Sequence, residues 1–116
     1  MNFAVLVSGN GTNLQAIIDA CSRGEITSLL KVVISNKAEA YALQRAGDAG
    51  VAAVFVDPKQ YDDRVAYDAA VMEVLKKHSV DFIVLAGYMR ILSVELINAY
   101  PGKILNIHPS LLPNFK

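Results

Sequence analysis

Five short apolar runs, separated by segments of helical periodicity, constrain the fold of this chain more than any other feature. The runs contain little polar alternation and comprise Phe3–Val7, Lys31–Ser35, Ala53–Val56, Phe82–Ala86 and Ile104–Ile107. Near-continuous apolar strands are typical of parallel sheets that are covered on both faces. The alternation of strand and helix therefore predicts an α/β fold with a Rossmann-like, doubly wound, mostly parallel sheet.

Helical patterns between the runs indicate what covers this sheet. After the first run, apolar side chains recur at helical spacing: Leu14, Ile17, Ile18 and Cys21. Thr12 and Gln15 fit a capping box that begins this helix. A second stripe spans residues 67–78, and Ser93 can cap a third, short helix. Because ligands of doubly wound sheets bind at the carboxyl ends of the strands, the residues at those ends are the functional candidates.

The composition fits one domain and argues against several kinds of partner. Of 116 residues, 53% are hydrophobic and 19% charged, which allows a sizeable core. Eleven basic residues balance eleven acidic ones without a basic run, so we expect neither nucleic acid nor a membrane surface as a partner. No stretch reaches the roughly 18 apolar residues of a membrane helix, and no signal-peptide pattern opens the chain. With Cys21 as its one cysteine, the chain is expected to be cytoplasmic.

The stretch SGNGTNLQ joins the first apolar run to the first helix, and its glycines suggest a bound phosphate. Two glycines match the dinucleotide fingerprint G-x-G-x-x-G, but Leu14 occupies the third glycine position. The next run ends in Ser35–Lys37, without the carboxylate that would hold a ribose hydroxyl, so we expect no NAD. Gly11, Thr12 and Asn13 would instead hold one phosphate monoester at a helix N-terminus. A tight strand–helix turn with an ordinary cap is the alternative.

The last apolar run carries Asn106 and His108, which are two residues apart and therefore point to the same side of a strand. The asparagine amide can stabilise a developing oxyanion, and the histidine can exchange a proton near neutral pH. This pair would lie at the same sheet edge as the glycine loop. A strand-end pair that the local backbone satisfies is the alternative.

The stretch VLAGYMRILS places four residues along the same edge: Met89, Arg90, Ile91 and Leu92. An apolar run with one arginine could bind a flat ring with an acidic tail. A strand–helix connector with a surface arginine is the alternative. Arg64, in the first turn of the second helix, is by itself a solvated charge. We expect no metal site, because two histidines and one cysteine are scattered far apart in the sequence.

Four motifs in order, SGNGTNLQAIIDA, SNKA, VLAGYMRILS and LNIHPSLLP, resemble those of the phosphoribosylglycinamide formyltransferases, a family of folate-dependent enzymes of purine biosynthesis. The resemblance covers residues 1–116, and the combination is far more specific than any single motif. It implies that Gly11, Thr12 and Asn13 hold the phosphate of glycinamide ribonucleotide.

The resemblance also implies how the formyl donor, 10-formyltetrahydrofolate, would bind. Residues 89–92 would line its site, and Arg64 and Arg90 would lie near its acidic end. Asn106 would bind the formyl oxygen and His108 would be the general acid. The glycinamide amine would attack the formyl carbon directly, while Asn106 and protonated His108 stabilise the resulting oxyanion.

The family domain is longer than this chain, and its catalytic aspartate follows the proline-rich loop in which the chain stops. We therefore expect residues 1–116 to be the N-terminal nucleotide-binding part of a single formyltransferase domain. Alone, this part is expected to be inactive and to self-associate or to pair with the C-terminal half. One alternative is a formyltetrahydrofolate hydrolase or methionyl-tRNA formyltransferase, both expected to lack the SGNGTNL loop. Another is a nucleotide-binding half-domain without chemistry.

Overall fold

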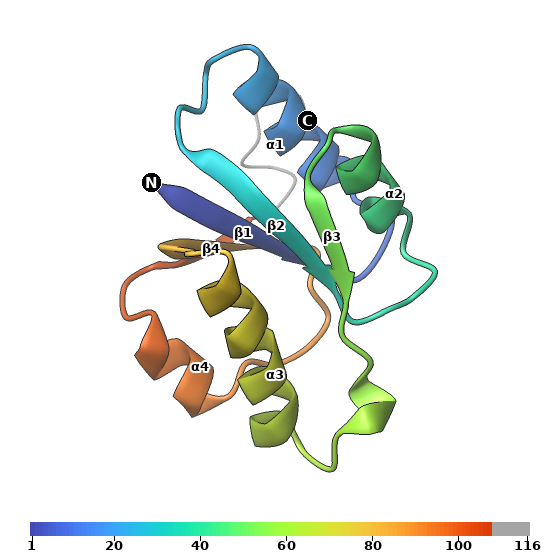
Figure 1. Ribbon diagram of the computed structural model, residues 1–116, viewed down its shortest axis with the longest axis vertical. Helices are drawn as coiled ribbons and strands as arrows, with labels where there is room; N and C mark the ends of the chain where they lie inside the picture. The colour runs from blue at the N-terminus through green and yellow to red at the C-terminus, as the bar shows by residue number, and fades with distance from the viewer. Residues whose placement is uncertain (108–116) are drawn as a thin grey trace.

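The computed structural model describes residues 1–107, which form a five-stranded sheet with helices on both faces (Figure 1). The strands are β1 (Asn2–Val7), β2 (Leu29–Ser35), β3 (Ala52–Phe55), β4 (Phe82–Ala86) and β5 (Ile104–Ile107). They lie in the order β3-β2-β1-β4-β5, and each neighbouring pair is parallel. The predicted doubly wound α/β sheet is confirmed, and within the described residues it is parallel throughout.

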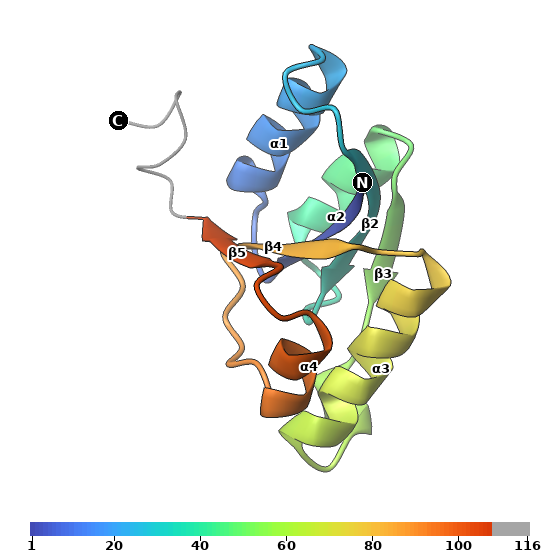
Figure 2. The ribbon, with the colours of Figure 1, turned by 90° about the vertical axis from the view of Figure 1, so that its left-hand side faces the viewer.

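The helices between the strands cover the sheet from two sides. They are α1 (Thr12–Ser22), α2 (Tyr41–Asp48), α3 (Arg64–Lys77), α4 (Val94–Ala99) and the short 3-10 helix η1 (Pro58–Gln60). Helices α1 and α2 lie on one face of the sheet, whereas α3 and α4 lie on the other (Figure 2). Together they bury both faces of the central strand β1. Within residues 1–107, no helix is long and apolar enough to cross a membrane.

The central strand β1 shows why its sequence reads as one unbroken apolar run. Phe3, Val5 and Val7 pack toward α1 and α2, while Ala4 and Leu6 pack toward α3. All five side chains are at most 2% exposed. Because successive side chains of a strand point to opposite faces, a strand between two helical layers needs apolar residues at every position.

The starts of the helices follow the sequence expectation at α4 but not at α1. Ser93 Oγ accepts a hydrogen bond from the amide of Leu96 at 3.1 Å and caps α4 as predicted. Helix α1 instead has Gly11 as its N-cap, in a left-handed conformation with φ 84°, and no described side chain caps it. The capping box from Thr12 and Gln15 is therefore wrong, because Thr12 is already the first helical residue.

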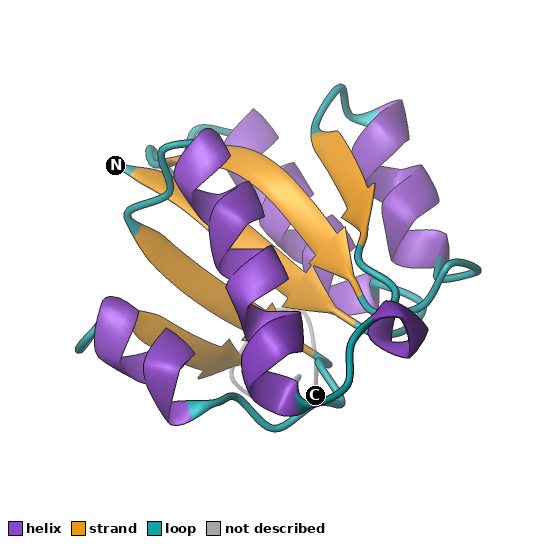
Figure 3. Ribbon diagram, turned by 60° about the horizontal axis from the view of Figure 1, so that its bottom comes forward, coloured by secondary structure: helices purple, strands orange, loops and turns teal. Residues whose placement is uncertain are grey.

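The carboxyl ends of the five strands meet at one edge of the sheet, where the arrowheads point in Figure 3. The strand order changes direction between β1 and β4, since β2 and β3 lie on one side and β5 on the other. This is the topological switch point of the sheet, where open α/β folds bind their ligands.

Candidate functional site

A small pocket opens at the switch point between the carboxyl ends of β1 and β4. Its volume is about 160 Å³. It is lined by the end of β1, the glycine loop and the end of β4: Val7, Gly9, Asn10, Gly11, Thr12, Asn13, Ala86 and Gly87. The structure thus brings all three predicted phosphate-binding residues together around one cavity.

The N-terminus of α1 presents backbone donors to this pocket that no side chain occupies. Its N-cap makes no side-chain hydrogen bond with the described residues, and its first turn holds no acidic residue. Thr12 is exposed, whereas Asn13 is 9% exposed and its Oδ1 has no hydrogen-bond partner within residues 1–107. Unpaired amides and the positive end of a helix dipole favour an anion. The arrangement can therefore hold a single phosphate group.

The glycine loop is held from behind by Arg45 of α2, a residue that the sequence analysis did not select. Arg45 Nε donates to the carbonyl oxygen of Asn10 at 2.9 Å, and Nη2 donates to Asn10 Oδ1 at 2.8 Å. A third bond runs from Nη1 to Gln15 Oε1 at 3.1 Å, and the guanidinium lies 4.8 Å from the ring centroid of Tyr41. These acceptors are neutral, so the positive charge of Arg45 stays beside the loop.

Gly11 has a packing role in addition to the one that its motif suggests. A Cβ at this position would lie 2.7 Å from Ala42 Cβ and 2.9 Å from Ala42 Cα on α2. The backbone also has φ 84°, which side chains other than glycine rarely adopt. The sequence analysis explains this glycine by the approach of an anion, but the space on its Cβ side belongs to α2.

Ser8, also missed by the sequence analysis, joins the ends of three strands. Its Oγ donates to Asn36 Oδ1 at 2.6 Å and accepts from the amide of Met89 at 2.8 Å. Asn36 follows β2, where a dinucleotide-binding protein carries its ribose-binding acid. In this chain the side-chain oxygen at that place is engaged by Ser8.

The loop after β4 exposes two of its predicted binding residues and partly buries the other two. Gly87, with φ 69°, turns the chain away from the sheet. Met89 is 78% exposed and Ile91 is 71% exposed, so both present apolar surface at the edge. Leu92 packs instead against the core on the α3 side.

Arg90 is partly exposed, and its guanidinium turns toward Tyr67 on α3. Its guanidinium carbon lies 4.1 Å from the ring centroid of Tyr67, and its buried Nε has no hydrogen-bond partner among the described residues. Tyr67 Oη donates to the carbonyl oxygen of Val56 at 2.8 Å, and burial raises the pKa of the Tyr67 phenol, which stays neutral at pH 7. Arg64 is the first residue of α3, the helix that contains Tyr67, and its side chain is exposed. The structure thus brings both predicted arginines to the first turn of α3.

Asn106 is exposed on the edge strand β5. Ile104 packs with the core on the α3 side and Ile107 with the core on the α1 side, so the alternation places Asn106 on the α3 side. Ile107 therefore points away from Asn106, as predicted, and Asn106 shares its face with α4. His108 lies outside the described residues.

These positions can be set beside known proteins. A family model described as formyl transferase matches residues 1–116. The chain belongs to the formyl transferase family.

Relatives of this formyl transferase chain carry more specific names. Phosphoribosylglycinamide formyltransferase of Escherichia coli (strain K12) is 49% identical over 115 residues, a match that covers 99% of this chain and 54% of that protein. Trifunctional purine biosynthetic protein adenosine-3 of Gallus gallus is 49% identical over 113 residues, or 97% of this chain and 11% of that protein. Glycinamide ribonucleotide transformylase 1 from Symbiobacterium toebii superposes with a TM-score of 0.91 at 52% identity, covering 99% of this chain and 54% of that one. The chain thus spans about half the length of these bacterial relatives.

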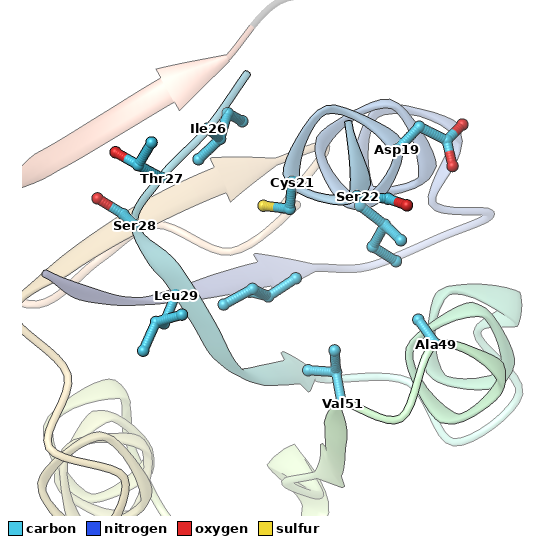
Figure 4. Close-up of a pocket in the computed structure, with 11 residues that line it drawn as sticks. Asp19, Cys21, Ser22, Ile26, Thr27, Ser28, Leu29, Ala49 and Val51 are labelled. Atoms are coloured by element: carbon cyan, nitrogen blue, oxygen red, sulfur yellow. The ribbon is translucent and has the colours of Figure 1, made fainter. Parts of the chain in front are cut away.

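Another pocket of the formyl transferase chain lies away from all these residues. Its volume is about 570 Å³, and it lies at the amino-terminal edge of the sheet, between the end of α1 and the start of β2 (Figure 4). Cys21 lines it, and burial raises the pKa of this thiol. A third pocket, of about 470 Å³, lies beyond β2 and β3. Within residues 1–107, no cluster of three or more His, Cys, Asp or Glu side chains could hold a metal ion.

Proposed function

We propose that this chain is the N-terminal, nucleotide-binding part of a phosphoribosylglycinamide formyltransferase. The complete enzyme would transfer a formyl group from 10-formyltetrahydrofolate to the amine of glycinamide ribonucleotide. The observation that carries this proposal is the N-terminus of α1 at the switch-point pocket, where no side chain of residues 1–107 caps the helix, beside an exposed apolar loop. The relatives whose names specify this activity support it.

The phosphate of glycinamide ribonucleotide would bind in the pocket formed by Gly11, Thr12 and Asn13. The amides of Thr12 and Asn13 belong to the first turn of α1, where the helix dipole adds to their attraction for an anion. Leu14 at the third glycine position of the dinucleotide fingerprint supports one phosphate group rather than the pyrophosphate of a dinucleotide.

The formyl donor would bind along residues 89–92. The exposed side chains of Met89 and Ile91 offer apolar contact to a flat ring, and Leu92 supports them from the core. Arg64 and Arg90 would attract the acidic tail, because each carries a guanidinium that can pair with a carboxylate. The residues present therefore fit a ligand that is apolar at one end and acidic at the other.

Asn106 and His108 would act on the formyl group itself. The Asn106 amide would donate a hydrogen bond to the formyl oxygen as the glycinamide amine attacks the formyl carbon. His108 would supply the proton that the leaving folate nitrogen takes up. Asn106 is exposed on the same sheet face as α4, which follows the proposed donor loop, and this supports its contact with the donor.

The sheet edge supports the proposal that residues 1–116 are part of a larger domain. Among residues 1–107, β5 has a neighbouring strand on one side only, and Leu105 is 58% exposed there. Apolar strand edges of this kind pair with another chain or are covered by further polypeptide. Sedimentation of the isolated chain should therefore show self-association that the C-terminal half suppresses.

The activity is tested with the complete enzyme in three parallel assays. Formyl transfer should depend on glycinamide ribonucleotide and yield equal amounts of formylated product and deformylated folate. Release of formate without the ribonucleotide would indicate a formyltetrahydrofolate hydrolase. Transfer of the formyl group to methionyl-tRNA would indicate a methionyl-tRNA formyltransferase. Binding of glycinamide ribonucleotide without turnover in any of the three assays would indicate a nucleotide-binding half-domain without catalytic activity.

A further inference from the structure

We propose that the hydroxyl group of Ser8 fixes the phosphate loop (residues 9–13) and the donor loop (residues 87–92) relative to each other. Ser8 is then a positioning residue for formyl transfer, one that touches neither substrate. The inference rests on the proposed function, because it concerns the alignment of the two substrates.

Ser8 is the residue at which the two loops meet. It directly precedes the phosphate loop, and its Oγ accepts a hydrogen bond from the amide of Met89 in the donor loop at 2.8 Å. Its own amide donates to the carbonyl oxygen of Gly87 at 3.2 Å. The first bond depends on the side chain and the second does not. An alanine at position 8 therefore removes the link to Met89 and keeps the link to Gly87.

Asn36 orients the hydroxyl group of Ser8 by accepting its proton in a hydrogen bond. The hydroxyl proton points to Asn36 Oδ1 over a short 2.6 Å contact, which leaves the oxygen lone pairs for the amide of Met89. Ser8 is 3% exposed, so water does not readily replace either partner. Asn36, which follows β2 and belongs to neither loop, thereby orients the hydrogen bond between Ser8 and Met89.

Each loop also has an anchor of its own that does not involve Ser8. Arg45 holds Asn10 in the phosphate loop through two hydrogen bonds. Just beyond the donor loop, the amide of Ser93 donates to buried Asp68 Oδ2 at 2.7 Å. Loss of the Ser8 hydroxyl should therefore leave each loop able to bind its substrate while the spacing between them relaxes. A misplacement of about 1 Å can cost on the order of 10²-fold in rate.

Ser35 provides a matched control. It is a fully buried serine at the end of the neighbouring strand β2, and its Oγ accepts from the amide of Lys37 at 3.1 Å. It also donates to the carbonyl oxygen of Lys37 at 3.2 Å, so both of its bonds stay within one turn. Ser35→Ala thus removes a buried strand-end hydroxyl without touching either loop.

The test compares steady-state kinetics of the complete enzyme with amide hydrogen exchange at Met89. Ser8→Ala should lower kcat about 10- to 100-fold with both KM values within about threefold, whereas Ser35→Ala should keep kcat within about twofold. Exchange at the Met89 amide should accelerate in Ser8→Ala and not in Ser35→Ala. If Ser8→Ala does not fold, Asn36→Ala should show the same pattern with a smaller fall in kcat.

Unchanged kcat in the folded variant, or a rise in one KM alone, would overturn the inference. Unchanged Met89 exchange in Ser8→Ala would do so as well, whatever the substrates are. Absence of formyl transfer in the unaltered enzyme would instead refute the proposed function, and the exchange measurement would still decide whether Ser8 links the loops.

Discussion

Replacing Gly11 with alanine should destabilise the protein more than replacing any other described glycine that has a positive φ. The left-handed backbone at φ 84° costs a non-glycine residue about 1–2 kcal/mol. A Cβ placed 2.7 Å from Ala42 Cβ adds overpacking of about 1–3 kcal/mol, since the neighbouring atoms belong to the helix backbone and a short side chain. The expected loss, about 2–5 kcal/mol, is a large share of the 5–15 kcal/mol that typically holds a domain together.

Two other glycines separate the backbone contribution from the packing contribution. Gly24 has φ 77° and nothing within 4 Å of an added Cβ, so Gly24→Ala should show only the backbone cost of about 1–2 kcal/mol. Gly9 has neither a positive φ nor a close neighbour, and Gly9→Ala should stay within about 0.5 kcal/mol of the parent. The free energies of unfolding are measured by urea denaturation of the complete protein.

A Gly11→Ala variant that loses no more stability than Gly24→Ala would refute the packing argument. A second check uses the neighbour itself, because Ala42→Gly removes the atom that the new Cβ would meet first. Ala42→Gly should therefore recover part of the loss in the Gly11→Ala background while being destabilising on its own.

Four further predictions concern single side chains. Arg90→Ala should raise the KM for the formyl donor about tenfold and leave that for the ribonucleotide within about twofold; equal effects on both would indicate a purely structural role. Arg45→Leu should do the reverse, because it removes three hydrogen bonds behind the phosphate loop. Asn106→Ala should lower kcat roughly 10²- to 10³-fold with little change in Tm, whereas exposed Asn98 on α4 serves as a control whose alanine variant keeps full activity. Cys21 should react slowly with iodoacetamide at pH 7, because burial raises its thiol pKa and keeps the thiolate scarce; the rate should rise with pH and on unfolding, and rapid alkylation at pH 7 would contradict this.

The central strands β1, β2 and β4 were predictable because a local rule governs them, whereas β3 and β5 are more exposed and were found from their apolar sequence alone. A strand between two helical layers must be apolar on both faces, and the five apolar runs agree with the observed strands to within two residues at either end. A second rule, that the carboxyl ends of parallel strands lie at one edge of the sheet, placed the glycine loop and Asn106 at the same edge. Ser93 was predictable as a cap because its partner, the Leu96 amide, is three residues away.

The support of the site was not predictable, because its contacts join residues that are distant in sequence. Arg45 reaches Asn10 across 35 residues and Ser8 reaches Met89 across 81, and no periodicity or motif reports such pairs. Gly11 shows a second limit. The sequence alone does not show whether a loop glycine is required by a bound ligand or by a neighbouring helix. At Gly11 the position of Ala42 on α2 in the structure decides for the helix. The capping box failed for a related reason, since the left-handed Gly11 begins the helix one residue earlier than the box requires.

The central place of β1 determines when the chain can fold during its synthesis. Phe3 of β1 pairs with Phe82 of β4, 79 residues later, so the first strand to be made is among the last to gain both neighbours. At about 5–20 residues per second, the ribosome needs on the order of 4–16 s to supply that second partner. Throughout this interval the strand that is most buried in the finished sheet has an open edge, and β2 is the one neighbour already made. Misassembly is therefore most dangerous before residue 86 emerges, and slow synthesis between β2 and β4 prolongs that exposure.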